Sequence, residues 1–380
     1  MTGQSGWGKT YLLSQLLAKC FKIGHRVVVF DSSDSFTYEA LCRNLSKAFV
    51  DMYITIHDLD KDGVPIDLFR INSDTSLPSK KKLLLGVLQA GIGELSAPQS
   101  NVLRTILSNV ISEQNDNDRF STDAILNKLY GMDEELFDPD YLNEYFKPLF
   151  KELKACDYDY TELAEYNISE TLCDLSKKGK NNRNVTVESL LNRMEPLFED
   201  IEECGMSFKS WGEFLRSSNK IIVIRTNSAY TESGNQLIDM LLATLYNYQH
   251  DNPQIPLDVF IDELQNQDFS ATGPIRKVMK EGRKSHMSFF GATQDYYPRN
   301  TELGSVMGKA GTQIFLRPTP NSTNVVAAEL RFSKAEIERF DGMMRGDLIV
   351  KANLFNKELG RNVPTTISGH VNDYPKIPDN

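Results

Sequence analysis

The chain has 380 residues, of which 40% are hydrophobic and 25% charged, and its formal net charge is −10. This composition is typical of a globular protein, and the length favours one large domain with an insertion, or two domains. No apolar run approaches the roughly 20 residues that cross a bilayer, and the first residues lack the features of a signal peptide. Five scattered cysteines without a C-x-x-C pair favour reduced thiols and a cytoplasmic location over disulfides or a zinc site.

The negative charge is concentrated in one stretch of the chain. Residues 133–204 contain 19 acidic and 8 basic side chains, a balance of −11. The remainder is therefore close to neutral, at +1. The acidity of the whole chain thus does not exclude contact between the remaining part and DNA.

The first third of the chain changes from an α/β pattern to a helical one. After a glycine-rich start, a helix is expected over 11–23, and an apolar, β-branched run at 25–30 predicts a buried parallel strand. A further short strand is expected at 66–71. From residue 79 to about 204 the pattern is helical with breaks, and 120–206 contains little that is typical of a strand.

Strand-like runs then return and alternate with helices, which is typical of a parallel sheet covered on both faces. The expected strands are 220–225, 257–261, 287–292, 312–316 and 347–351, with helices over 236–249 and 274–284. We therefore predict an α/β fold with a mostly parallel central sheet flanked by helices, and an inserted all-helical subdomain. The expected boundaries are 1–75 and 215–370 for the core, 76–214 for the acidic insertion and 371–380 for a tail.

The start of the chain matches the phosphate-binding pattern G-x-x-x-x-G-K-[ST] from Gly3 to Thr10. Glycines let backbone N–H groups curl around phosphates, Lys9 supplies a positive charge, and the Thr10 hydroxyl can bind Mg²⁺. The motif predicts a P-loop nucleotide hydrolase of the RecA-like type with ATP and Mg²⁺ as cofactors. The expected nucleotide-binding residues are Gly3, Gln4, Ser5, Gly6, Trp7, Gly8, Lys9, Thr10 and Tyr11.

Two further strand ends complete the predicted site. The run 257–261 is followed by Asp262, expected to hold Mg²⁺ as a Walker B aspartate does, and by Glu263, expected to activate the attacking water. The run 287–292 leads to Gln294, which could sense the γ-phosphate or orient that water. The alternatives are an acidic helix start after the first of these strands and an ordinary polar strand end after the second. Ligands in such folds bind at the carboxyl ends of strands, which favours the catalytic interpretation.

One feature does not fit the pattern. A P-loop normally follows a strand, yet only Met1 and Thr2 precede Gly3. This favours a chain cut just before its P-loop over a first strand supplied from elsewhere. It also predicts a reduced affinity for nucleotide.

With these residues, the chain resembles the HerA/FtsK superfamily of P-loop translocases, which includes conjugation-type ATPases. In that superfamily the Walker B strand is followed by a helix, a G-R-[KS] turn and a strand ending in A-T-Q. Here the corresponding residues are Asp262-Glu263, 282–284 (GRK) and 292–294 (ATQ). Asp31 stands where HerA-like proteins have an aspartate after the second strand.

The resemblance covers 1–75 and about 215–370 and is incomplete. Ser35 replaces the acidic residue of an acidic-aromatic pair, and Asp295-Tyr296 stands where an R-P pair is common, so the resemblance implies no role for that arginine here. The resemblance does not extend to the middle helical region. The resemblance extends to the HerA-like ATPases of bacterial defence systems, such as DptH.

The resemblance implies a hexameric ring in which an arginine reaches the neighbour's γ-phosphate. Arg283 is the first candidate, with Arg299 and Arg331 as alternatives. A basic cluster could meet DNA phosphates, although a solvated helix face is the simpler interpretation. Its members are Arg276, Lys277, Lys280, Arg283 and Lys284. Tyr296 and Tyr297 could stack on bases, but packing at a strand end is the expected role.

The expected function is Mg²⁺-dependent ATP hydrolysis by a ring-shaped homo-oligomer that moves double-stranded DNA in a bacterial DNA-processing or defence system. One alternative keeps the ATPase but moves protein, as conjugation-type motors do. A second is a nucleotide-gated scaffold or sensor with little turnover. A protein partner could bind the helical insertion.

Overall fold

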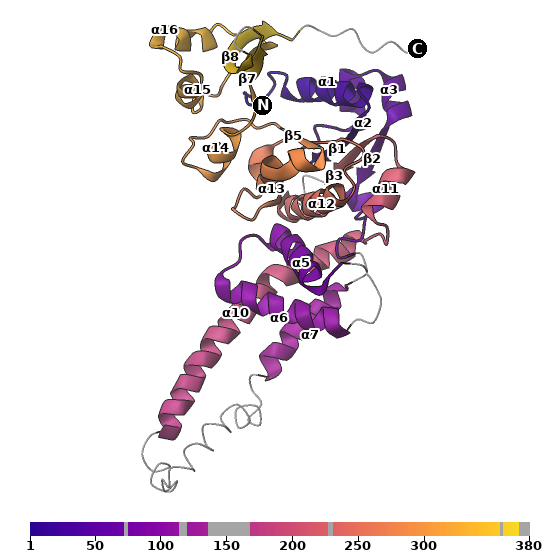
Figure 1. Ribbon diagram of the computed structural model, residues 1–380, viewed down its shortest axis with the longest axis vertical. Coiled ribbons are helices and arrows are strands. Elements are labelled where there is room, and N and C mark those ends of the chain that lie inside the picture. Colours follow the sequence, from indigo (N-terminus) through magenta and orange to yellow (C-terminus); the bar gives the residue numbers. More distant parts are fainter. Residues whose placement is uncertain (72–74, 114–119, 136–167, 227–230, 358–359, 372–380) are drawn as a thin grey trace. The chain divides into compact units, whose positions relative to one another are not determined.

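The computed structural model describes residues 1–71, 75–113, 120–135, 168–226, 231–357 and 360–371 (Figure 1). The chain forms two compact units. The core unit consists of residues 1–68, 86–94 and 200–380, and the helical unit of residues 69–85 and 95–199. Residues 136–167 of the predicted insertion and 372–380 of the predicted tail lie outside the described residues.

The core unit is built on five parallel strands in the order β2-β3-β1-β4-β5. Phe30 of β1 lies opposite Ile224 of β3 and Ile261 of β4, so all three strands end at the same edge. Helices cover both faces, which explains the nearly continuous apolar runs in the central strands. The strands are β1 (Arg26–Asp31), β2 (Ile54–Asp58), β3 (Ile221–Arg225), β4 (Leu257–Ile261) and β5 (Met287–Gly291).

Helices α1 (Lys9–Lys22), α2 (Tyr38–Asn44) and α3 (Lys47–Tyr53) lie on one face of this sheet, and α12 (Thr231–Asp251) and α13 (Pro274–Glu281) on the other (Figure 1). The first face has a hydrophobic core in which Leu13 and Leu17 of α1 pack with Val27 and Val29 of β1. This packing fixes the start of α1, and with it the P-loop, at the carboxyl edge of the strands. The core unit also contains α4 (Leu59–Asp62), α11 (Trp211–Ser217), α14 (Glu302–Met307), α15 (Thr323–Leu330) and α16 (Lys334–Ile337).

A second sheet of three antiparallel strands comprises β6 (Thr312–Phe315), β7 (Asp347–Asn356) and β8 (Arg361–His370). The residues before the P-loop lie between the two sheets. Thr2 forms parallel bridges with Thr293, just after β5, and with Phe315 of β6. The Thr2 amide donates to Ile314 O at 2.8 Å, and its carbonyl accepts from Leu316 N at 2.8 Å. This short segment therefore occupies the position between β5 and β6 that a strand preceding a P-loop would take.

The helical unit contains α6 (Ala97–Glu113), α7 (Thr122–Glu135), the first part of α5 (Leu77–Ile92) and most of α10 (Ile168–Cys204). Its core includes the edge-on rings of Phe69 and Phe198, whose centroids lie 5.8 Å apart. No strand is present among the described residues of this unit, as predicted. In the part of the chain that the structure describes, no helix is both long enough and apolar enough to span a bilayer.

The predicted parallel α/β core is confirmed, but the strands expected at 312–316 and 347–351 lie in the separate antiparallel sheet, and two further elements differ from expectation. The strand expected at 66–71 is absent, and a strand lies at 54–58 instead as β2. Ile66 and Leu68 are buried without a strand partner, and the intervening amide of Asp67 donates to Lys209 O at 2.8 Å. β7 extends to Asn356 and pairs with β8, which was not expected because β8 is polar and largely exposed.

Candidate nucleotide-binding site

The P-loop adopts the backbone that its glycines permit. Gly6 and Gly8 have φ angles of 77° and 97°, in the left-handed region that side chains disfavour. Gly8 immediately precedes α1, so the backbone amides at the start of that helix have no helical acceptors. Gly3 packs against the chain after β6, where an added Cβ would lie 2.7 Å from Leu316 Cβ. The sequence therefore shapes a loop whose amides can surround an anion.

Lys9 is buried within this loop. Its ammonium donates to Gly3 O at 2.7 Å and to Gln4 O at 3.1 Å. Burial lowers the pKa of Lys9, although the charges of Asp262, Glu263 and Asp295 oppose the shift. The ammonium is thus positioned at the loop, next to carboxylates on two neighbouring strand ends.

Thr10 and Asp262 lie in direct contact. The Thr10 hydroxyl donates to Asp262 Oδ2 at 3.1 Å, and the Glu263 amide donates to Oδ1 at 3.0 Å. Asp262 is only 2% exposed. Burial raises the pKa of Asp262, and hydrogen bonds from Ser35 and Thr10 offset this only in part. A buried carboxylate beside a threonine hydroxyl is the oxygen pair with which P-loop proteins hold Mg²⁺.

Glu263 is presented toward Gln294. Its backbone has a φ of 53°, unusual for a residue with a side chain, and such positions concentrate at functional sites. Gln294 Nε2 donates to both carboxylate oxygens of Glu263, at 3.1 and 3.3 Å, and Gln265 donates to one of them. The structure therefore brings Lys9, Thr10, Asp262, Glu263 and Gln294 to one edge of the sheet.

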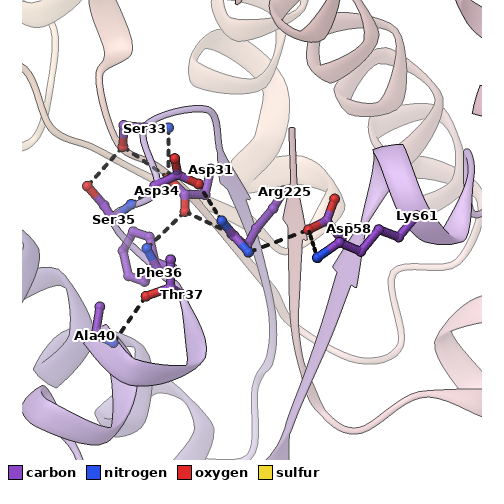
Figure 2. A network of polar contacts seen from close by, with 10 residues as sticks. All are labelled: Asp31, Ser33, Asp34, Ser35, Phe36, Thr37, Ala40, Asp58, Lys61 and Arg225. Atoms are coloured by element: carbon purple, nitrogen blue, oxygen red, sulfur yellow. Dashed lines mark hydrogen bonds and ion pairs between the residues drawn. The ribbon is translucent and has the colours of Figure 1, made fainter. Parts of the chain in front are cut away.

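The same edge continues into a charged network across β1, β3 and β2 (Figure 2). Arg225 ends β3 and forms ion pairs with Asp31 and Asp58, both at 3.6 Å, and with Asp34. Asp31 is fully buried and accepts hydrogen bonds from the backbone amides of Ser33, Ser35 and Phe36, and from the Ser33 hydroxyl. The aspartate noted by resemblance thus organises the turn after β1.

The arginines proposed for the γ-phosphate are not at this site. Arg283 is exposed and lies just before β5, at the opposite end of that strand from Gln294. Arg299 donates to Glu329 from Nε at 2.9 Å and from Nη2 at 2.8 Å, and Lys351 also binds this carboxylate. Arg331 is exposed at the end of α15.

The predicted basic cluster forms an exposed face, in which only Arg276 is half-buried. Lys277 also lies over the ring of Tyr246, 4.6 Å from its centroid. This exposure fits the solvated helix face, and the contact with DNA stays a prediction. Tyr296 is 3% exposed and packs against Phe315, with ring centroids 5.3 Å apart. Packing at a strand end, the expected role of this tyrosine, is therefore what the structure shows.

Two arginines at the carboxyl edge were missed from the sequence. Arg225 ends an apolar strand, as Asp31 does, and that shared position was a usable signal. Arg317 follows β6, and its guanidinium lies over the Trp7 ring, 5.1 Å from the centroid. Its carbonyl accepts from the Gln4 amide at 2.9 Å. Without the position of β6 beside the P-loop, no sequence signal connects Arg317 with this site.

No protein-family model matches the sequence, and no curated protein matches it. The fold is similar to solved structures. VirB4 of Thermoanaerobacter pseudethanolicus has a TM-score of 0.64 at 14% identity, covering 100% of this chain and 90% of VirB4. The plasmid coupling protein TrwB in complex with ADP and Mg²⁺ has a TM-score of 0.60 at 12% identity, covering 99% of this chain and 84% of TrwB. TrwB with the ATP analogue ADPNP scores 0.61 at 13% identity, covering 99% and 85%. The chain therefore has the RecA-like P-loop fold that VirB4 and TrwB share.

Proposed function

We propose that this chain is a Mg²⁺-dependent ATPase of the FtsK/HerA-like superfamily, to which VirB4 and TrwB belong. The observation that carries the proposal is the convergence of Lys9, Thr10, Asp262, Glu263 and Gln294 at the P-loop. The donor set fits the cofactor. Loop amides and Lys9 would hold the phosphates of ATP, and Thr10 and Asp262 would hold Mg²⁺, which neutralises charge on the phosphates.

Glu263 is the proposed general base, and Gln294 its positioning partner. A carboxylate at this strand end can take a proton from the water that attacks the γ-phosphate. The hydrogen bonds from Gln294 fix the orientation of that carboxylate. Loss of the γ-phosphate would therefore change the position of Gln294, at the end of β5, through its contact with Glu263.

We further propose that the ATPase works as a ring-shaped homo-oligomer, and that Arg283 acts on a neighbouring copy. Between Met287 and Gly291, β5 rises by about 13 Å, at about 3.3 Å per residue. Arg283 is therefore too far from Gln294 to serve its own site. Mixing the inactive variants Arg283→Ala and Lys9→Ala tests this, because mixed rings would contain sites with an intact P-loop and an intact neighbouring arginine. Recovered hydrolysis supports action in trans, and no recovery at any mixing ratio contradicts it.

Movement of double-stranded DNA is the proposed output, in a DNA-processing or defence system. The test is steady-state ATP hydrolysis with and without linear double-stranded DNA, with Lys9→Ala as the blank. Stimulation by DNA that disappears in the blank supports the DNA motor. Similarity to VirB4 favours a second candidate, a conjugation-type motor that moves protein, for which hydrolysis indifferent to DNA is expected. Absence of hydrolysis in the parent protein contradicts both motors.

A further inference from the structure

The charges around the P-loop are unbalanced for a site that binds phosphates. Three carboxylates, those of Asp262, Glu263 and Asp295, act electrostatically on Lys9, and Asp262 is hydrogen-bonded to the adjacent Thr10. A Mg²⁺ ion offsets two of these negative charges, but a nucleotide brings several of its own. A low-dielectric site strengthens such repulsions, so a second cation would strengthen the binding of polyphosphate.

Arg317 lies where such a cation would be useful. It follows β6 by two residues, at the edge of the second sheet adjoining the P-loop. Backbone contacts fix this position, because Gln4 N donates to Arg317 O at 2.9 Å and Gln4 Nε2 donates to Pro318 O at 2.9 Å. The side chain extends over Trp7, a residue of the phosphate-binding loop itself.

The contacts of the Arg317 guanidinium are weak enough to be exchanged. Its ion pair with Asp341 is 4.0 Å long, and the Asp341 side chain is 89% exposed. Such exposed pairs contribute little, and a cation–π contact at a half-exposed site is similarly modest. Arg225, in contrast, is 16% exposed and paired with three carboxylates. Arg299 is held by the two hydrogen bonds that it donates to Glu329.

We propose that Arg317 binds phosphate in the nucleotide site of its own chain. When nucleotide binds, the Arg317 guanidinium leaves the Trp7 ring and contacts the polyphosphate. This inference rests on the proposed ATPase function and adds to it a second cation besides Lys9. A guanidinium donates several N–H groups in one plane, which suits phosphate oxygens. Trp7 holds the guanidinium beside the loop until a phosphate replaces the ring as its partner.

The test compares two ligands in isothermal titration calorimetry, ADP and tripolyphosphate, each with Mg²⁺. Arg317→Met removes the charge but keeps an unbranched apolar side chain over Trp7. Loss of a charge-assisted hydrogen bond should weaken both ligands by a similar factor, about tenfold to a hundredfold. Arg317→Lys should retain most of the affinity. Arg216→Met is the matched control. Arg216 is exposed in α11, and because α11 leads into β3 it lies at the amino ends of the strands, away from the P-loop at their carboxyl ends.

Three outcomes would overturn the proposal. Arg317→Met could bind both ligands as tightly as the parent. It could weaken ADP alone, which would place the side chain on the base. Finally, Arg317→Met and Arg317→Lys could show equal losses of affinity and equal decreases in melting temperature. Arg317 would then stabilise the structure of the loop without binding phosphate. Failure of the parent protein to bind either ligand contradicts the proposed function itself. Lys9→Ala provides the calorimetric trace expected when no ligand binds.

Tryptophan fluorescence gives a second readout. The sequence contains two tryptophans, Trp7 and Trp211, and Trp211 is buried with its indole N–H donating to Thr244 at 2.9 Å. Departure of the guanidinium should change the emission of Trp7 when tripolyphosphate is added. The change should be absent in Trp7→Phe and strongly reduced in Arg317→Met. An equal change in parent and Arg317→Met would contradict the movement.

Discussion

Arg225→Met is the substitution whose effect on stability the structure predicts most directly. Arg225 pairs with Asp31, Asp34 and Asp58, and Asp31 is fully buried (Figure 2). Methionine keeps most of the aliphatic length of the side chain but removes its charge. The change therefore leaves a buried carboxylate without its cation, beside a second carboxylate on β2.

The magnitude follows from the geometry of the pair. At an effective dielectric constant of about 20, unit charges 3.6 Å apart attract each other by about 5 kcal/mol. The Asp31 carboxylate keeps its hydrogen bonds from the following turn, which reduce the cost of losing the cation. We therefore expect the free energy of unfolding to fall by about 3 kcal/mol, at the lower end of the range for breaking a buried pair.

Urea-induced unfolding followed by tryptophan fluorescence measures this change, because Trp7 and Trp211 both belong to the core unit. The matched control is Asp34→Asn, which removes a partner whose side chain is 45% exposed and should cost less than about 1 kcal/mol. Combining Arg225→Met with Asp31→Asn should restore part of the loss, because the fully buried carboxylate is then neutral and Asp58 keeps its ion pair with Lys61. A loss below about 1 kcal/mol in Arg225→Met, or full additivity in the double variant, would refute this reasoning.

Three further predictions concern catalysis, pH and close packing. Glu263→Gln should lower ATP turnover by about a hundredfold or more with nucleotide affinity unchanged, measured by steady-state hydrolysis and calorimetry, and turnover at the parent rate would contradict the base assignment. The pKa of Glu329 is lowered from its ordinary value of 4.5 to about 2. Burial alone would raise this pKa, but hydrogen bonds from Arg299 and Lys351 outweigh the effect of burial. Stability from this carboxylate is therefore present above pH 4.5 and lost as the pH falls through 2, so Glu329→Gln should cost about 3 kcal/mol at pH 7 and little at pH 2 in urea titrations. Gly304→Ala should lower the melting temperature, because its Cβ would lie 1.9 Å from Pro298 O, whereas Gly86→Ala, with open space in α5, should stabilise by up to about 1 kcal/mol.

The central strands could be predicted because burial on both faces requires apolar residues along their whole length. The runs at 25–30, 220–225 and 257–261 have this property, and each is a strand. β2 was missed because it is an edge strand of the sheet, in which only Ile54 is buried and polar residues are tolerated. The run 66–71 has the apolar residues of a strand, but they fill the core without pairing. Hydrophobicity alone cannot distinguish these two cases.

The catalytic constellation could be predicted because the carboxyl ends of parallel strands share one edge. That rule placed Asp262, Glu263 and Gln294 near Lys9 without any knowledge of strand order. The same rule places Arg225 at the strand ends that also hold Asp31, but it could not show which strands are neighbours, and it gives no signal for the partner of Trp7. Arg225 lies far from Asp31 in sequence and is opposite it only through the register of β1 and β3, and Arg317 depends on β6 lying next to the P-loop. Long-range register is information that local sequence does not contain.

The position of Thr2 has a mechanical consequence. This residue connects the five-stranded sheet to β6 through hydrogen bonds on both of its flanks. A force acting on the second sheet, for example at the exposed β7–β8 ribbon, would be transmitted to the first sheet through the residues that lead into the phosphate loop. The residues that lead into the phosphate loop are thus hydrogen-bonded to both sheets. If the loop changes shape when it binds a ligand, these hydrogen bonds would transmit the displacement to both sheets.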